Sequence, residues 1–308
     1  MSTKQKVGLL ALAAIVAIVS VRAVQDTVTD TSVERQMVND YNVYALPIPD
    51  NVTFAGERAP LEDPELRERF DRELHVNTYW QSNGLFMFKR ANRFFPTIER
   101  ILAEEGVPDD FKYLAVIESG LTDARSPAGA SGFWQIMKQT GKEYGLEVND
   151  NVDERYHLEK ATRVAAKYLK ESYNRFGNWT TAAAAYNAGN AGIGTRLEEQ
   201  QVDNYYDLLL GQETGRYVFR ILAIKQIMEN PQQYGFNFRQ SDLYSEVTTS
   251  RVPVDTAITN IASFAKRYGV NYKILKRHNS WLRENKLNNA SRKQYYIEIP
   301  ARGTYTVF

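Results

Sequence analysis

Glu118 is the residue whose position in this sequence most directly suggests chemistry. The stretch FKYLAVIESG, residues 111–120, has a helical period in which Phe111, Leu114, Ala115 and Glu118 occupy positions i, i+3, i+4 and i+7. The glutamate therefore shares the face that the other three bury, in the last turn of the helix. Burial and the negative end of the helix dipole both disfavour an ionised carboxylate. The pattern predicts a raised pKa, the property that a general acid needs near neutral pH.

The helix that carries this glutamate has a clear predicted beginning and end. Pro108-Asp109-Asp110 gives a plausible start, and Gly120 gives a stop. A structural role is the alternative for the glutamate, because a glutamate at a helix end is often paired with an arginine or a lysine. Most glycosidases use a second carboxylate. Asp123 is close in sequence and Glu213 is a candidate for closeness in space, but the sequence fixes neither distance.

Two segments beyond the helix add groups that suit a sugar. The loop ESGLTDARSPAGASGFWQIM combines Gly, Ser and Pro and then places Trp134, Gln135 and Met137 together, which supplies amide, apolar and aromatic contacts for a sugar ring. The segment TTAAAAYNAGNAGIG runs from a small-residue helix into Tyr186, Asn187 and glycines that can take tight turns. Taken alone, the second segment is equally consistent with a tightly packed helix and its ordinary C-terminal cap.

Together, the Glu-Ser pair, SPAGASGFWQIM and AYNAG resemble the lytic transglycosylase family of the goose-lysozyme-like superfamily, especially its membrane-bound murein type. The resemblance extends over roughly residues 100 to 230 and includes ETGRYVFRIL. It implies a mostly helical, lysozyme-like fold, a peptidoglycan groove and one catalytic glutamate, which is Glu118. Many relatives have Met where this chain has Trp134. The positions to which the resemblance assigns substrate contacts are Ser119, beside the catalytic acid, then Ser126, Gln135 and Met137 around the muramic acid, and Tyr186, Asn187, Glu213 and Tyr217 on the opposite wall.

The resemblance also implies a mechanism with a single carboxylate. Glu118 protonates the glycosidic oxygen between MurNAc and GlcNAc, and the N-acetyl group of the substrate stabilises the cation at C1. The ionised Glu118 then accepts the proton of the C6 hydroxyl, which closes a 1,6-anhydro ring. A hydrolytic muramidase is the nearest alternative. A non-catalytic peptidoglycan-binding scaffold and a purely structural helical protein are alternatives of other classes.

The pattern along the chain predicts a mainly α protein with a small α+β appendage. Residues 61–242 have a helical period almost throughout and form the predicted catalytic domain. Residues 243–308 predict a β-α-α-β module, from the extended SEVTTSRVPV to the alternating QYYIEIP. This module resembles a degenerate lysin-motif peptidoglycan-binding module. A structural cap on the catalytic domain is the alternative.

The N-terminus predicts export. Residues 1–23 have a basic start and an apolar run from Val7 to Val21, the layout of a signal peptide, with an uncleaved membrane anchor as the alternative. Residues 24–60 lack a sustained period and predict an extended linker. Export is consistent with a bacterial envelope, and the family resemblance implies the periplasm.

The amino-acid composition limits the classes of ligand and macromolecule that the chain is expected to bind. With 38 Lys+Arg against 37 Asp+Glu, the net charge of +1 gives no field that favours nucleic acid. The absence of cysteine excludes disulfides, a thiol nucleophile and thiolate metal sites. His75, His157 and His278 lack metal-ligand spacing, so we expect no metal and no cofactor. The expected partners are peptidoglycan glycan strands, and the membrane if the N-terminus is uncleaved. The sequence identifies no protein partner.

Overall fold

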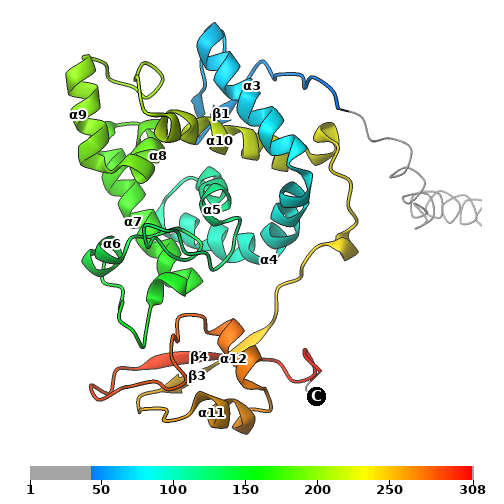
Figure 1. Ribbon diagram of the computed structural model, residues 1–308, viewed down its shortest axis with the longest axis vertical. Helices are drawn as coiled ribbons and strands as arrows, with labels where there is room; N and C mark the ends of the chain where they lie inside the picture. Colours follow the sequence, from blue (N-terminus) through cyan, green and yellow to red (C-terminus); the bar gives the residue numbers. More distant parts are fainter. Residues whose placement is uncertain (1–42, 307–308) are drawn as a thin grey trace, which may run out of the picture. The chain divides into compact units, whose positions relative to one another are not determined.

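The computed structural model describes residues 43–306, and Figure 1 traces the chain through them. The predicted signal peptide or anchor, residues 1–23, and the first part of the predicted linker lie outside the described residues. Within residues 43–306, no helix is both long enough and apolar enough to cross a membrane. Residues 46–306 belong to one compact unit.

The last part of the predicted linker is folded against the helical residues and is not a free linker. Strands β1 (Thr53–Phe54) and β2 (Glu57–Arg58) form a short antiparallel hairpin. Phe54 is fully buried in the core, and the backbone N–H of Ala55 donates to the carboxylate of Asp110 at 2.6 Å. A hairpin of two-residue strands is too short to show a period in the sequence, which explains why the pattern predicted a linker here.

Residues 61–242, the predicted catalytic domain, form a helical lobe with eight α-helices. They are α3 (Pro64–Tyr79), α4 (Gln81–Glu105), α5 (Lys112–Ser119), α6 (Lys138–Glu143), α7 (Leu158–Phe176), α8 (Trp179–Ala188), α9 (Asn190–Gln200) and α10 (Gln212–Glu229). Four 3-10 turns accompany them, η1 (Asp109–Phe111), η2 (Glu154–Tyr156), η3 (Pro231–Tyr234) and η4 (Gln240–Asp242). The predicted mainly α fold class is confirmed.

The helices begin and end at residues that favour caps, including the predicted stop at Gly120. The side chain of Asp63 accepts hydrogen bonds from two backbone N–H groups and caps α3. Gly106 and Gly120 take the left-handed conformation, with φ of 69° and 60°, at the ends of α4 and α5, where a residue without Cβ avoids a steric penalty. Asn230 follows the last residue of α10. These caps determine where each helix ends and therefore where the side chains of its last turn lie.

Helix α10 is the central element behind the site. Its apolar positions from Tyr217 to Ile227 are buried, and it packs against α3, α5 and α8. Tyr217, Ile221 and Ile224 are buried along one face of the helix, and Met228 is half-buried. A helix buried on several sides brings polar residues of its first turns next to α5 and α8, whose ends carry other predicted site residues.

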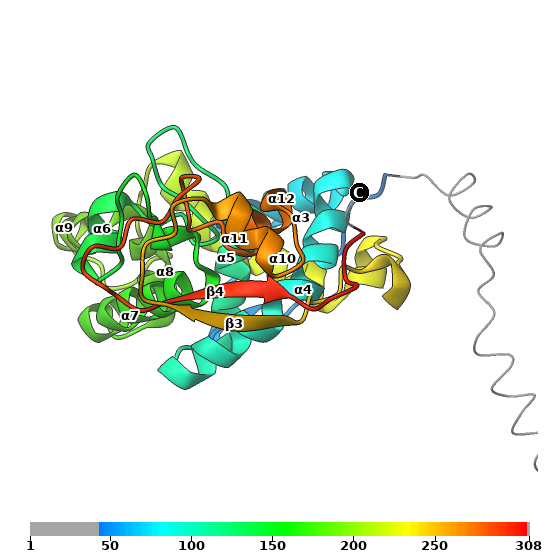
Figure 2. The same cartoon turned by 90° about the horizontal axis from the view of Figure 1, so that it is seen from below.

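The C-terminal module has the predicted β-α-α-β order. Strand β3 (Thr249–Val254) pairs antiparallel with β4 (Tyr295–Pro300), and helices α11 (Ile261–Arg267) and α12 (Tyr272–His278) lie between them in sequence. Figure 2 shows the two strands side by side. Ile258, before the first residue of α11, forms an isolated bridge with Leu287.

The module shares its hydrophobic core with a loop of the lobe. Val152 and Tyr156, between α6 and α7, are buried in the same cluster as Ile297 and Leu275 of the module. The backbone N–H of Asp153 donates to the carbonyl of Trp281 at 2.9 Å. The hydrophobic core of the module therefore includes residues from both sides of the domain boundary predicted at residues 242 and 243.

Candidate active site

Glu118 lies where the helical period predicted it, in the last turn of α5. Phe111, Leu114 and Ala115 are fully buried, and Glu118 is half-buried at the end of the same face. The η1 turn that precedes α5 is fixed by Asp110, whose carboxylate also accepts from Lys225 Nζ of α10 at 2.7 Å. The start of the helix is thus bound to α10. The burial of its apolar face fixes the position of Glu118 at the other end of the helix.

Tyr217 of α10 contacts the glutamate directly. Its buried hydroxyl donates a hydrogen bond to Glu118 Oε1. Burial raises the pKa of Glu118 to about 6, and the charge of Glu213 adds to the increase, while the Tyr217 hydrogen bond and the charge of Arg220 oppose it. The pKa is raised as predicted, and its largest cause, desolvation, is one of the two causes that the sequence indicated. Such a carboxyl group can change protonation state near neutral pH, as a general acid or base requires.

Tyr186 of α8 stands on another side of the glutamate. Its hydroxyl donates to the backbone carbonyl of Trp134 at 2.8 Å, and its ring meets that of Tyr168 edge-on at 5.5 Å. Burial raises the pKa of Tyr186 well above its usual value, and the nearby charge of Glu118 contributes. The structure therefore brings together three predicted residues, Glu118, Tyr186 and Tyr217, from α5, α8 and α10.

Asn187 and Glu213 also meet, as their assignment to one wall implies. Asn187 Nδ2 donates to Glu213 Oε1 at 3.3 Å, and Thr214 Oγ1 donates to Asn187 Oδ1 at 2.8 Å. These bonds join the end of α8 to the start of α10. Glu213 is exposed, so its carboxylate is open to solvent beside the half-buried Glu118.

The side chains of the Gly-Ser-Pro loop largely bind the loop itself. Ser119 Oγ donates to the carbonyl of Phe133 at 2.9 Å, Ser126 Oγ accepts from the N–H of Ala130 at 3.0 Å, and Gln135 Nε2 donates to the carbonyl of Gly132 at 2.8 Å. Ser119 thus ties α5 to the loop. These contacts give the loop a fixed shape beside Glu118.

Trp134 corrects one sequence expectation. Its ring is fully buried, and its Nε1–H donates to Thr162 Oγ1 at 2.8 Å, so it does not offer a face to a sugar ring. The loop has no regular period from which the direction of this side chain could be predicted. Met137, with 46% of its surface exposed, is the apolar side chain of the predicted set that faces solvent.

Arg155 braces this loop and was missed from the sequence. Its Nη1 donates to the carbonyls of Gly129 and Ile136 at 2.9 and 3.1 Å, and its Nη2 pairs with Asp153 Oδ2 at 2.7 Å. Both charged residues are buried. The loop backbone approaches so closely that a Cβ on Gly132 would lie 2.1 Å from the Arg155 carbonyl oxygen. No local signal in DERYH distinguishes this arginine from a surface charge.

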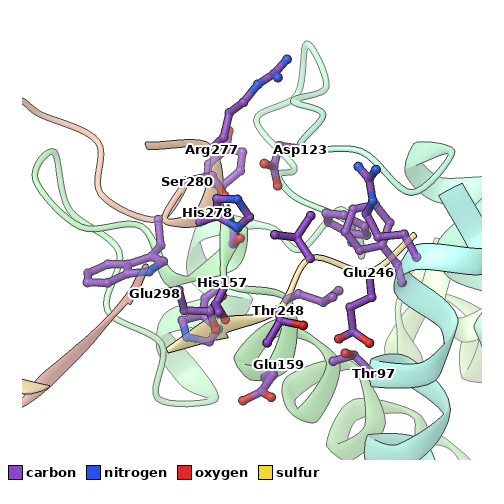
Figure 3. Close-up of a pocket in the computed structure, with 18 of the residues that line it drawn as sticks. Thr97, Asp123, His157, Glu159, Glu246, Thr248, Arg277, His278, Ser280 and Glu298 are labelled. Atoms are coloured by element: carbon purple, nitrogen blue, oxygen red, sulfur yellow. Dashed lines mark hydrogen bonds between the residues drawn. The ribbon is translucent and has the colours of Figure 1, made fainter. Parts of the chain in front are cut away.

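A cavity of about 820 Å³ lies between the lobe and the module (Figure 3). It is lined by Asp123, His157 and His278 among others, and by none of the predicted site residues. Burial raises the pKa of Asp123, against a hydrogen bond from Ser280 and the charge of Arg283. Asp123 therefore contacts the module, and the site around Glu118 is defined by its residues and not by this cavity.

Two of the three histidines have identified hydrogen-bond partners. His75 Nε2 accepts from the N–H of Leu46 at 3.0 Å, and the ring of His278 is 2.9 Å from the hydroxyl of Tyr305. Among the described residues there is no group of three or more His, Cys, Asp or Glu side chains that could hold a metal ion.

Two known families match parts of the chain. Residues 96–208 match the family described as Transglycosylase SLT domain. Residues 250–303 match the family described as Soluble lytic transglycosylase C-terminal LysM-like domain. The first match contains Glu118 and Tyr186, and it ends before Glu213 and Tyr217.

Curated relatives match more of the chain. Membrane-bound lytic murein transglycosylase D of Escherichia coli strain K12 is 28% identical over 258 residues, which are 81% of this chain and 55% of that protein. A putative tributyltin chloride resistance protein of Alteromonas sp. strain M-1 is 27% identical over 106 residues, 34% of this chain and 51% of that protein. The chain thus spans about half the length of these curated relatives.

Solved structures give a partial likeness. The 70 kDa soluble lytic transglycosylase of Escherichia coli has a TM-score of 0.40 and 18% identity, over 69% of this chain and 42% of that one. An inactive mutant of lytic transglycosylase Slt from Pseudomonas aeruginosa has a TM-score of 0.36 and 23% identity, over 49% of this chain and 26% of that one.

Proposed function

We propose that this chain, which carries a transglycosylase SLT domain and a LysM-like C-terminal domain and is homologous to a membrane-bound lytic murein transglycosylase, cleaves peptidoglycan as a lytic transglycosylase. The bond cleaved is the β-1,4 bond from MurNAc to GlcNAc. The peptidoglycan glycan strand is the partner, and the bacterial envelope is the place of action.

The environment of Glu118 is the observation that carries the proposal. A carboxyl group with a pKa of about 6 is populated in both protonation states near neutral pH. The cause is burial on an apolar helix face, and Tyr217 fixes one oxygen by its hydrogen bond. A group that must first give a proton and then accept one needs both states within reach.

The proposed reaction balances without water. Glu118 transfers its proton to the glycosidic oxygen, the C1–O bond breaks, and GlcNAc leaves with a free hydroxyl. The N-acetyl oxygen of MurNAc stabilises the positive charge at C1. The C6 hydroxyl oxygen then bonds to C1, and its proton returns to Glu118. The products together have the composition of the substrate, and the new MurNAc end is a 1,6-anhydro ring.

The other predicted residues would hold the glycan around this carboxyl group. Tyr186, Asn187 and Glu213 stand at the junction of α8 and α10, and Met137 presents an exposed apolar surface at the end of the Gly-Ser-Pro loop. Ser119, Ser126 and Gln135 would act chiefly by keeping that loop in shape, because their side-chain hydrogen bonds run within it and to α5. Sugar sites commonly combine such polar and apolar contacts.

Further proposals concern the ends of the chain. The C-terminal module is proposed to bind glycan strands, and its LysM-like match supports this role. Residues 1–23 are proposed to direct export, either as a cleaved signal peptide or as a membrane anchor.

A hydrolytic muramidase is the second candidate function, because one observation favours it. Glu213 is an exposed carboxylate on the α10 turn before Tyr217, and its charge acts on Glu118. A carboxylate in this position could activate water as a general base.

The catalytic role of Glu118 is tested by turnover of purified peptidoglycan with two matched carboxamide variants of residues 24–308. Glu118→Gln keeps shape and hydrogen-bonding capacity but cannot transfer a proton as a carboxyl group does. We expect it to lose at least about 100-fold in turnover, the usual contribution of general acid catalysis. Asp123→Asn, which alters a carboxylate facing the module, is the control and should keep most activity.

Substantial turnover by Glu118→Gln would contradict the assignment. Loss of activity in Asp123→Asn to the same degree, with both variants folded, would instead indicate a mechanism with two carboxylates.

A further inference from the structure

Two arginines from different helices contact the end of α5 on either side of Glu118. Arg90 of α4 donates from Nη1 to the carbonyl of Gly120 at 3.0 Å. Arg220 of α10 donates from Nη2 to the carbonyl of Ile117 at 3.1 Å. The last carbonyls of an α-helix have no partner within the helix and carry the negative end of its dipole. Cationic donors are therefore favourable there. The two carbonyls that the arginines bind belong to Ile117 and Gly120, on either side of Glu118 in the sequence.

Each arginine is held in place by its surroundings. The guanidinium of Arg90 lies 5.3 Å from the ring centre of Phe86, one turn earlier on α4, a distance typical of a cation–π contact. Arg220 is half-buried on α10, three residues after Tyr217, so both face α5 from the same helix. Neither contact has a local sequence signal, because the partners are 30 and 103 residues apart.

The two arginines differ in their electrostatic effect. The groups that face Glu118 are Tyr217, Arg220 and Glu213 from α10, Tyr186 from α8 and the Arg90-bound end of its own helix. Of the two arginines, Arg220 is the one whose positive charge lowers the pKa of Glu118. The two arginines thus offer similar hydrogen bonds to the helix end, and the charge of Arg220 also acts on the Glu118 carboxyl group.

We propose that Arg90 and Arg220 are positioning residues that clamp the last turn of α5, and that Arg220 also stabilises the carboxylate that Glu118 becomes after giving up its proton. The inference rests on the proposed function of Glu118 as acid and then base. A residue that acts first as an acid and then as a base must be neutral in the first step and ionised in the second. Burial favours the neutral form, and the charge of Arg220 offsets part of that preference.

The test is the pH dependence of kcat/KM on peptidoglycan for full-length variants that keep or remove each charge. Activity requires protonated Glu118 in the free enzyme, so kcat/KM should fall as pH rises through the pKa of Glu118. Arg220→Gln removes the charge and retains a possible donor to Ile117. It should move this alkaline limb upward by about half a pH unit or more. Arg220→Lys keeps the charge and should leave the limb near its native position.

Arg90→Gln is the matched control. It also replaces a guanidinium that binds a carbonyl of the helix end, and it should lower kcat without moving the limb. An unchanged limb in Arg220→Gln, or an equal shift in Arg90→Gln, would overturn the assigned role of Arg220. Native activity in every variant would overturn the clamp itself.

A titration without turnover separates this inference from the proposed function. Carbon NMR of the Glu118 side-chain carboxyl, in full-length protein with labelled glutamate, reports its pKa directly. If the native protein does not cleave peptidoglycan, the proposed function fails. A higher Glu118 pKa in Arg220→Gln than in Arg90→Gln still supports the electrostatic effect of Arg220, and equal values contradict it.

Discussion

At the scale of single residues, Glu118 combines two requirements that oppose each other. Burial on the apolar face of α5 raises its pKa to about 6, while Tyr217 and Arg220 favour the ionised form. The folded protein therefore pays free energy to hold an ionised Glu118 at neutral pH. Active sites often carry such a cost, because the property that destabilises the fold is the one that the chemistry uses.

This cost predicts that Glu118→Gln is more stable than the native protein at neutral pH. The folded pKa of about 6 lies above the ordinary value of 4.5, so the group favours folding below pH 4.5 and this contribution is lost as pH rises through 6. The gain at pH 7.5 should reach at most about 2 kcal/mol, from 1.36 kcal/mol per pKa unit. Urea unfolding at pH 7.5 and pH 4 measures it.

The comparison between the two pH values is the decisive part of that experiment. The stability difference between Glu118→Gln and the native chain should nearly vanish at pH 4, where both side chains are neutral. An equal difference at both values would show that it arises from packing and not from the buried charge.

At the scale of elements, the conformation of the loop from Ser119 to Met137 is stabilised by a buried arginine that lies outside the loop, Arg155. Arg155 binds two carbonyls of the loop and is neutralised by Asp153. The loop also packs into the core through Leu121, Phe133, Trp134 and Ile136, and the Nε1–H of Trp134 donates to Thr162. The brace in turn lies on the segment whose Val152 and Tyr156 enter the core of the module.

Replacing Arg155 should therefore destabilise the fold strongly. Arg155→Met leaves Asp153 buried without its partner and should cost about 3–5 kcal/mol in the free energy of unfolding, as for other broken buried ion pairs. Arg292→Met, at a side chain that is 74% exposed, is the control and should change stability by less than about 0.5 kcal/mol. Chemical denaturation measures both, and a cost below about 1 kcal/mol for Arg155→Met would contradict the brace.

At the scale of the whole molecule, local patterns predicted the elements well and their mutual contacts poorly. The helical period and Gly120 fixed α5 and placed Glu118 on its apolar face, and alternation predicted β4. The direction of Trp134, the clamp by Arg90 and Arg220, and the core shared through Val152 depend on contacts between distant segments. Periodicity reports only local structure, so such contacts leave no trace in it.

The proposed function joins these scales in one claim, that a single buried carboxyl group cleaves the glycan without water. Mass spectrometry of the muropeptides released in water enriched in the heavy oxygen isotope tests it most directly. We predict MurNAc ends that are one water lighter than hydrolysis products, carry no heavy oxygen and are absent with Glu118→Gln. Reducing MurNAc ends that contain heavy oxygen would contradict the account and identify a hydrolase.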